Sequence, residues 1–376
     1  MSKHTYLSSR SIGLIKRGSV TARESDTSQL QEPELTLTGF EISQKALMPP
    51  RYASGCYSIR FAPGGGALVG GFGNGAVLMY EKDAQGLFTQ QSTLRKGSRY
   101  ADDTIMAVRF HPKQSKILYS CAIFGTIFRH NLTGKPDEKC EKFAEENNNR
   151  INAIDLNMAG ELLASGGKDL SLRIYDTQTK ELIQEYKGYH PSTPQKESGG
   201  HALSVFCIKF HPDQRDVLLT GGWDDTIKAS SFPIWDMRTD AGMIGSLGGP
   251  HICGEAIDIK GETVVTGSWK ADQAIQLWDL RQRLPIKSLA TFRKTHVEGD
   301  NIYAVQFARS DPDGHHLLTA GSGTNSFQYI NHMTEKVIGT GATQKPFSTV
   351  DSTGQVLAAA GGDGWIRLLH VPGRRH

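Results

Sequence analysis

Residues 204–238 read SVFCIKFHPDQRDVLLTGGWDDTIKASSFPIWDMR, and this stretch decides the fold. Short apolar or alternating runs begin at Val205 and at Val217, and a last run ends in Ile234-Trp235-Asp236. Tight turns separate these runs, one at His211-Pro212 and one at Asp224-Asp225. Runs of this length, with Pro, Gly and Asp between them, are typical of antiparallel strands joined by short turns. The stretch therefore predicts three strands of one small sheet.

The same pattern occurs seven times along the chain. Equivalent positions of the first strand recur every 45 to 54 residues, which indicates a repeat fold. The units span Cys56–Glu81, Ile105–Asn131, Ile151–Asp176, Ser204–Arg238, Gly254–Asp279, Ile302–Asn331 and Phe347–Val371. Apolar pieces between units, such as Leu284–Leu289, can supply a fourth strand to each sheet. The fourth unit carries an insertion, Ala229–Pro233. Because proline cannot donate to a ladder, we expect this segment either to bulge out of the third strand or to disrupt it, and it is either a real loop or an error in the translated gene.

Composition excludes several classes of protein. The chain has 376 residues, 38% of them hydrophobic and 22% charged, which is enough to bury a core. Its net charge of +3 makes a nucleic-acid partner unlikely, and no apolar run is long enough for a membrane helix or a signal peptide. The five cysteines are scattered, which favours a reduced intracellular compartment. We expect the cytoplasm, with the nucleus or a cilium as alternatives.

The ends of several units identify a family resemblance. The dipeptides Trp235-Asp236, Trp278-Asp279 and Tyr175-Asp176, together with Gly200-His201, are similar to those of the WD-repeat (WD40) family. The resemblance covers about residues 33–371 and implies an all-β fold, a seven-bladed β-propeller of four-stranded antiparallel blades. Units two and six depart from the pattern, because they end in Asn131 and Asn331.

The resemblance also implies a structural role for four polar residues. In the family, His, Ser or Thr, Asp and Trp form a buried hydrogen-bonded tetrad. Carried over to this chain, the set is His201, Thr220, Asp224 and Trp235. Buried polar groups must be paired, so we interpret the tetrad as structural and not catalytic.

The last unit predicts how the ring closes. It ends with its third strand and lacks a fourth, whereas Glu34–Ile42 alternates like a strand and belongs to no unit. We expect this N-terminal segment to complete the last blade, with Leu35 and Leu37 fixing the register. The predicted organisation is a disordered tail at residues 1–30, a propeller at 33–371 and a short tail at 372–376.

No constellation in the sequence points to catalysis. There is no phosphate-binding GxxxxGK[ST] loop, no HExxH and no paired-cysteine zinc pattern. Glu145-Glu146, followed by three asparagines, is interpreted as an ordinary polar loop. We therefore expect no catalytic residue, no cofactor and no metal, and predict that the protein is not an enzyme.

Two tryptophans are candidates for protein interaction. Trp223 and Trp269 follow Gly-Gly and Gly-Ser pairs in the matching turn of adjacent units, which places both on one rim of the ring. Exposed Trp there would be a typical interface anchor, and the alternative is that each ring folds back over its own blade. The longer turn after Trp269 predicts that it is the more exposed of the two.

Two arginines suggest a second kind of partner. Arg238 and Arg281 end the WDMR and WDLR sequences of consecutive units. In the family, such pairs resemble the motif by which substrate receptors dock on the adaptor of cullin–RING ubiquitin ligases. An arginine that merely satisfies a turn is the alternative.

The sequence thus predicts a non-catalytic scaffold that displays loops of a rigid propeller to protein partners, which it does not identify. A ubiquitin-ligase substrate receptor is one alternative, and an axonemal or ciliary structural subunit is another.

Overall fold

The computed structural model describes residues 32–98, 103–133, 139–188, 201–223, 231–238, 243–270, 273–289 and 301–371, with backbone alone at 231–236 and 243–247. The chain divides into two units, residues 1–31 and 32–376, and all described residues belong to the second. The predicted tails at 1–30 and 372–376 lie outside the described residues, as does Asp224. A search of the described residues found no helix able to cross a membrane.

Every element of the described chain is a β-strand, and antiparallel pairing groups the strands into sheets. Three sheets contain β3 (Cys56–Phe61), β4 (Ala67–Phe72), β5 (Val77–Lys82) and β6 (Phe88–Arg95); β7 (Ile105–Phe110), β8 (Ile117–Ala122), β9 (Thr126–Asn131) and β10 (Cys140–Glu145); and β11 (Ile151–Leu156), β12 (Leu162–Gly167), β13 (Leu172–Asp176) and β14 (Leu182–Tyr186).

Two further sheets contain β15 (Val205–Phe210), β16 (Val217–Gly222), β17 (Ser231–Asp236) and β18 (Met243–Gly248); and β19 (Ile257–Lys260), β20 (Thr263–Gly267), β21 (Ile275–Asp279) and β22 (Leu284–Leu289). The remaining two contain β23 (Asn301–Phe307), β24 (His316–Ser322), β25 (Ser326–Asn331), β26 (Lys336–Ala342) and β1 (Thr36–Thr38); and β27 (Phe347–Ser352), β28 (Val356–Gly361), β29 (Ile366–His370) and β2 (Glu41–Leu47).

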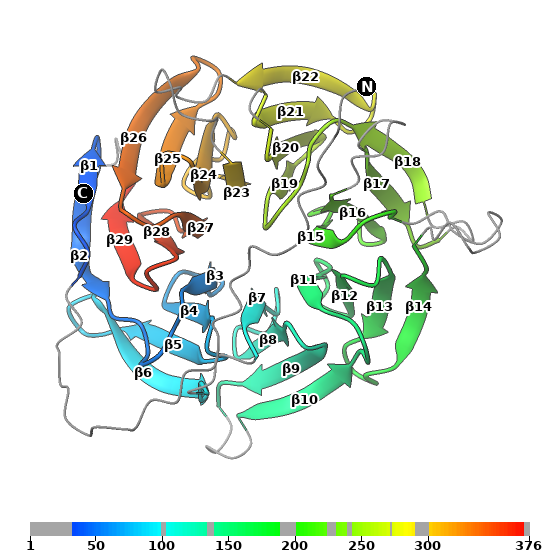
Figure 1. The fold of residues 1–376 in the computed structure, drawn as a ribbon, viewed down its shortest axis with the longest axis horizontal. Helices are drawn as coiled ribbons and strands as arrows, with labels where there is room; N and C mark the ends of the chain where they lie inside the picture. Colours follow the sequence, from blue (N-terminus) through cyan, green and yellow to red (C-terminus); the bar gives the residue numbers. More distant parts are fainter. Residues whose placement is uncertain are drawn as a thin grey trace, which may run out of the picture. The chain divides into compact units, whose positions relative to one another are not determined.

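The sheets form a ring in which each first strand lies beside the first strand of the next sheet (Figure 1). The contacts run from β3 through β7, β11, β15, β19 and β23 to β27, which returns to β3. The second strand of each sheet is almost wholly buried, and β8, β16 and β28 are buried along their full length. Burial on both faces explains why these strands are nearly continuous apolar runs and do not alternate. The protein is therefore an all-β propeller of antiparallel blades.

Aspartates tie neighbouring blades together at the axis. In three first strands the same position is an aspartate, whose Oδ2 accepts the backbone N–H of a first strand in the next blade. The three bonds are Asp155 with Phe210 at 2.8 Å, Asp258 with Phe307 at 2.9 Å and Asp351 with Phe61 at 2.7 Å. The last of them crosses the seam where the final blade meets the first.

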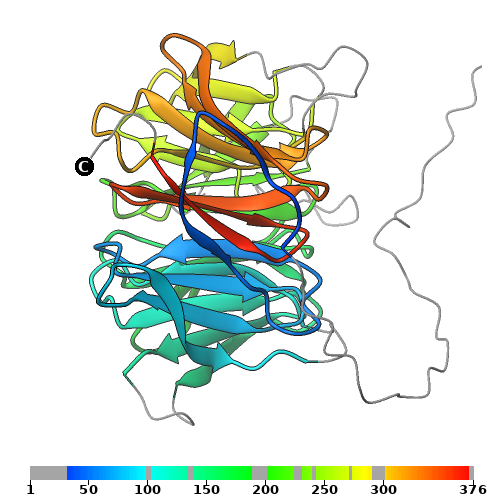
Figure 2. The same ribbon diagram turned by 90° about the vertical axis from the view of Figure 1, so that its left-hand side faces the viewer.

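The N-terminal segment contributes to two blades and not to one. β2 pairs with β29 and completes the last blade, so an N-terminal strand does close the ring. However, β1 pairs with β26 and adds a fifth strand to the preceding blade (Figure 2). The expectation of a single strand at Glu34–Ile42 and of four strands in every blade is therefore wrong: six sheets have four strands and one has five.

A turn at Gly39 causes this division. Its φ of +75° lies in the left-handed region, and a Cβ at this position would lie 2.1 Å from the carbonyl oxygen of Ile338. The chain therefore leaves one blade and enters the next within two residues. Leu35 and Leu37 pack with Phe40 on the apolar cluster between these two blades.

The insertion in the fourth unit is partly accommodated within its strand. β17 includes Ser231, Phe232 and Pro233, which pair with β18. On the other side of β17, the pairing with β16 runs only from Asp236 to Ile234. Pro233 lacks the N–H that a further ladder bond would need, so the strand ends its pairing with β16 there. Residues 231–233 therefore do not bulge out, and the alternative expectation, a disrupted third strand, is confirmed by the shortened pairing with β16.

Candidate functional site: an aromatic patch and a charged channel

The structure brings Trp223 and Trp269 together, with ring centroids 6.3 Å apart. Trp223 stacks on Phe206 at 5.0 Å and on His251 at 5.5 Å, and Trp269 meets Tyr303 edge-on at 5.1 Å. We call these five residues the aromatic patch. They come from β15, β23 and the connections that follow β16, precede β19 and follow β20, which all lie at one end of the ring.

The exposure of the two tryptophans is the reverse of the prediction. Trp223 is 37% exposed, whereas Trp269 is half-buried. The reason is local: the backbone N–H of Trp269 donates to the carbonyl oxygen of His251, which holds the residue close to Tyr303. The buried Nε1 of Trp269 has no hydrogen-bond partner among the described residues. The patch therefore presents an indole face and, beneath it, an unused N–H donor.

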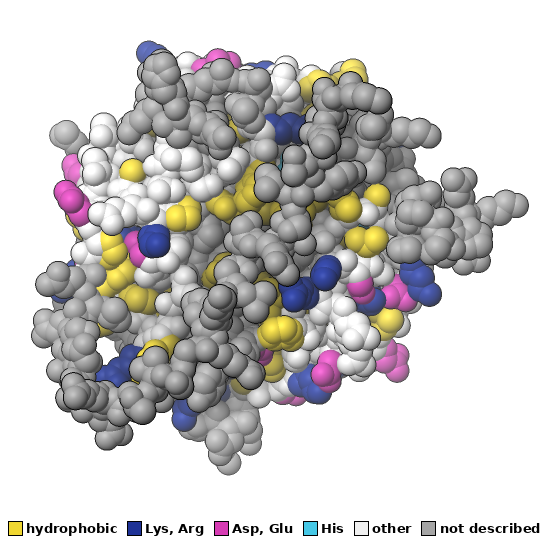
Figure 3. Space-filling model, in the orientation of Figure 1, with side chains coloured by type: hydrophobic (Ala, Val, Ile, Leu, Met, Phe, Trp, Pro, Cys, Tyr) yellow, Lys and Arg dark blue, Asp and Glu magenta, His cyan; other side chains and the backbone are white. Residues whose placement is uncertain are grey.

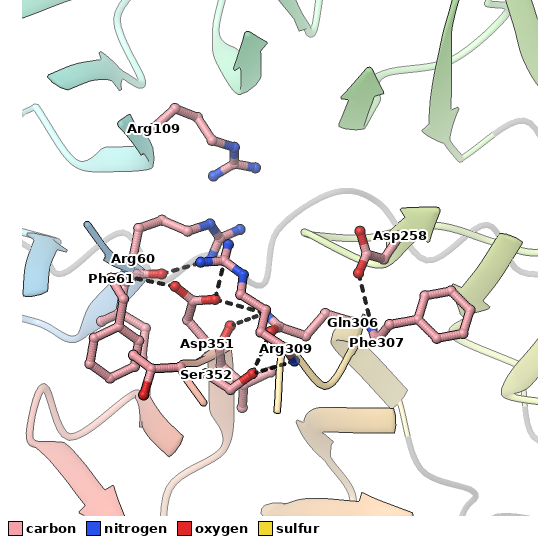
Figure 4. Close-up of polar contacts among 12 residues, drawn as sticks. Arg60, Phe61, Arg109, Asp258, Gln306, Phe307, Arg309, Asp351 and Ser352 are labelled. Atoms are coloured by element: carbon pink, nitrogen blue, oxygen red, sulfur yellow. Dashed lines mark hydrogen bonds and ion pairs between the residues drawn. The ribbon is translucent and has the colours of Figure 1, made fainter. Parts of the chain in front are cut away.

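A ring of polar side chains lines the central channel. It consists of one residue from the same position of each first strand: Arg60, Arg109, Asp155, Lys209, Asp258, Gln306 and Asp351. Strand alternation turns this position toward the axis, where neighbours pair. Arg109 contacts Asp155 at 3.1 Å and Lys209 contacts Asp258 at 2.8 Å. Figure 4 shows part of this ring, with Arg60 and Arg109 directed into the channel from different blades.

Glu255 crosses the channel and joins distant blades. It precedes β19, and its carboxylate accepts hydrogen bonds from Ser58 at 2.9 Å, Arg60 at 2.6 Å and Arg109 at 2.7 Å. Burial by itself would raise the pKa of Glu255, but the charges of Arg109 and Arg60 outweigh that effect and lower the pKa to about 2. The carboxylate thus remains ionised and holds the first two blades to the fifth.

Glu255 was not among the residues predicted from the sequence, although a signal for the channel was present. Aligning the seven units shows that one fixed position of every first strand is a charged or amide residue. That regularity marks the axis. Glu255 stands outside the aligned position, and only the closed ring brings it near Arg60 and Arg109.

The predicted tetrad is brought together as far as its residues are described. His201 Nε2 and Thr220 Oγ1 lie 2.7 Å apart, and both residues are buried. Asp224 lies outside the described residues, and only the backbone of Trp235 is described. In the next blade Trp278 Nε1 donates to Thr266 Oγ1 at 2.9 Å, and both residues are buried.

Glu146 contradicts its interpretation as part of an ordinary polar loop. Only 4% of the residue is exposed, and its carboxylate accepts hydrogen bonds from four side chains. The donors are Asn149 at 2.6 Å, Arg173 at 2.9 Å, Tyr175 at 3.1 Å and Ser165. In the third blade this carboxylate stands before the first strand, as His201 does in the fourth. Glu145, its neighbour, is exposed, so the acidic pair has one structural and one solvent-facing member.

The two arginines of the WDxR sequences lie away from the aromatic patch. Arg238 and Arg281 follow the third strands β17 and β21, whose ends lie opposite the patch. Both are exposed, and the Arg281 side chain, 79% exposed, lies 3.4 Å from Glu262. On the face seen in Figure 3, hydrophobic side chains lie near the middle of the ring, with Lys and Arg side chains beside some of them.

The described residues show no arrangement that indicates catalysis. All five cysteines are free, and no group of three or more His, Cys, Asp or Glu residues in the described part could hold a metal ion. Burial raises the pKa of the Cys121 and Cys207 thiols to about 12, so these thiols are protonated at neutral pH.

Comparison with known proteins agrees with the fold. The family model "WD domain, G-beta repeat" matches residues 138–176 and 192–229. The GATOR2 complex protein WDR24 of Danio rerio is 22% identical over 65% of this chain and 34% of its own length. The nuclear distribution protein nudF of Aspergillus niger is 25% identical over 57% of this chain and 53% of its own length. The APC/C activator protein CDH1 of Saccharomyces cerevisiae is 26% identical over 46% of this chain and 28% of its own length. The chain thus spans about a third to a half of these relatives.

Proposed function

Because the chain is a member of the WD-repeat family of β-propellers, we propose that it is a non-catalytic scaffold that presents a rigid face to protein partners. Counted with its five-stranded sheet, the ring has seven blades. The relatives bear the names of a complex component and of an activator, which supports a role in a multi-protein assembly inside the cell. The cytoplasm is the compartment that we propose.

The aromatic patch is the observation that carries this proposal. Trp223 is 37% exposed although it stacks on Phe206 and His251, and exposed apolar area costs about 25 cal/mol per Å². Aromatic residues of this kind anchor protein interfaces. We propose that the patch binds a peptide segment with an apolar side chain, which covers the exposed part of Trp223.

Affinity purification with mass spectrometry tests the scaffold. We expect Trp223→Ala to lose specific partners of the wild type while the thermal midpoint changes little. Met333→Ala is the matched control, because Met333 is also exposed but lies in the turn between β25 and β26 at the other end of the ring. If both variants retain the same partners, the patch is not the interface.

A ligase-receptor function is the second candidate, and the exposed Arg238 and Arg281 favour it. If these arginines bind a carboxylate-rich adaptor, the double variant Arg238→Ala/Arg281→Ala should lose the adaptor without unfolding. Removing a desolvated charged anchor costs on the order of 2–5 kcal/mol. Co-purification of a cullin adaptor with the wild type, absent from the double variant, would support this candidate. A wild type that never retains an adaptor would reject it.

A further inference from the structure

The channel contains two adjoining cavities toward the end opposite the aromatic patch. A cavity of about 80 Å³ lies inside the ring beside Glu255, and a wider one of about 350 Å³ opens at its mouth. The turns that follow the first strands form the rim, with Pro63, Pro112 and Pro212 among its lining residues. Glu255 is one of the lining residues of the inner cavity.

Four basic side chains line both cavities. They are Arg60, Arg109, Lys209 and Arg309, which come from four different blades. Figure 4 shows Arg60, Arg109 and Arg309 pointing toward one another across the channel. The outer cavity has a single acidic lining residue among those described, Asp155. Basic residues therefore outnumber acidic ones among the described lining of the outer cavity, whereas the carboxylates of Glu255, Asp258 and Asp351 lie deeper in the channel.

The carboxylates leave part of these basic groups unused. Oδ2 of Asp155 and Oδ2 of Asp351 each accept a hydrogen bond from a backbone N–H of the next blade. Arg309 is 51% exposed and reaches Asp351 only at 3.4 Å. Among the described residues, Nη2 of Arg109 and both Nε and Nη1 of Arg309 have no hydrogen-bond partner. Guanidinium donors that converge without partners are suited to an anion with several oxygens.

We infer that the mouth of the channel binds a small phosphate-bearing molecule. A tetrahedral phosphate offers acceptors in several directions and can bind donors from more than one blade, whereas a planar carboxylate accepts from one or two forks. The proline rim and Met158 provide apolar surface for the organic part of such a ligand. The site is separate from the aromatic patch and does not depend on the proposed scaffold function.

Isothermal titration of the full chain with pyrophosphate tests this inference. We expect saturable binding that weakens at least tenfold in Arg309→Gln. Arg309 is half exposed, so this variant should fold. Arg281→Gln is the control, because it removes a more exposed arginine charge outside the channel and should bind as the wild type does. Absence of saturation at millimolar pyrophosphate, or equal weakening in both variants, would overturn the inference.

A variant that is expected to tighten pyrophosphate binding and a second phosphate-bearing probe complete the test. Asp155→Asn removes the one acidic group at the mouth and should tighten pyrophosphate binding severalfold, with circular dichroism as the check on folding. Unchanged or weaker binding by a folded Asp155→Asn chain would contradict the site. Stronger binding of N-acetyl-phosphoserine amide than of pyrophosphate would overturn the small-molecule source in favour of a phosphorylated side chain.

Discussion

At the scale of single residues, Glu255 makes the stability of the ring depend on pH. Its pKa lies at about 2 in the folded protein, against an ordinary value of 4.5. A depressed pKa contributes stability above pH 4.5, and this contribution is lost as the pH falls toward 2. From that difference we expect a contribution on the order of 3 kcal/mol at neutral pH.

Glu255→Gln should therefore lower the free energy of unfolding by about 3 kcal/mol at pH 7, because Arg60 and Arg109 lose their shared partner. The difference in the free energy of unfolding between variant and wild type should become smaller as the pH falls below 4.5. Urea melts of both proteins between pH 7 and pH 3 measure it. The other carboxylates are present in both proteins, so their titration affects both alike. A difference in the free energy of unfolding that stays constant from pH 7 to pH 3 would therefore show that the Glu255 charge does not stabilise the fold.

Glu146 allows a comparison within one dipeptide. Glu146→Ala removes an acceptor shared by three buried donors and the partly buried Arg173, and should cost about 2–4 kcal/mol. Glu145→Ala removes a similar charge from an exposed neighbour and should stay within about 0.5 kcal/mol of the wild type. Similar midpoints for the two variants in chemical denaturation would refute the assignment of Glu146 as a buried hub.

These two glutamates mark the limit of prediction from sequence. His201 and Thr220 could be placed because the repeat pattern assigns a fixed position to each. Glu146 takes the place of the expected histidine, so pattern matching overlooks it. The exposure of Trp269 could not be predicted from the sequence either, because it depends on contact with Tyr303, which belongs to the next blade. Contacts within a blade follow from spacing, whereas contacts between blades require the closed ring.

At the scale of elements, the corner between β1 and β2 decides which blade each strand joins. Gly39 and Gly86 both have a φ near +77°, but a Cβ at Gly39 would meet backbone within 2.1 Å and one at Gly86 would meet nothing within 4 Å. Both Ala variants suffer backbone strain of about 1 kcal/mol. Gly39→Ala should lose about 1–3 kcal/mol more because it forces β1 away from β26.

Differential scanning calorimetry of Gly39→Ala and Gly86→Ala distinguishes strain from steric displacement. Equal melting temperatures would mean that β1 contributes nothing to the stability of its blade. The alternation in Glu34–Ile42 correctly indicated an extended segment, but no sequence pattern showed that the turn at Gly39 splits it. That split depends on the carbonyl of Ile338, which is about 300 residues away in the chain.

At the scale of the whole molecule, the ring should unfold as a single cooperative unit. Asp351→Ala breaks the bond across the seam to Phe61, and Asp155→Ala breaks the equivalent bond to Phe210. If closure joins all blades, each variant should lose about 1–3 kcal/mol and still show one transition. Tryptophan fluorescence and circular dichroism should then give coincident curves, whereas separate transitions for Asp351→Ala alone would locate a weak seam.

The pairing of β2 with β29 has a consequence for biosynthesis. Residues 41–47 leave the ribosome more than 300 residues before 366–370 are made. At ordinary rates of translation, roughly 15 to 60 s pass between the two events. During this interval the half-buried side chains of β2 lack their partner strand, and the nascent chain exposes an unpaired edge. Chaperones that bind extended apolar segments should therefore associate with this chain during its synthesis and leave once residue 370 has emerged.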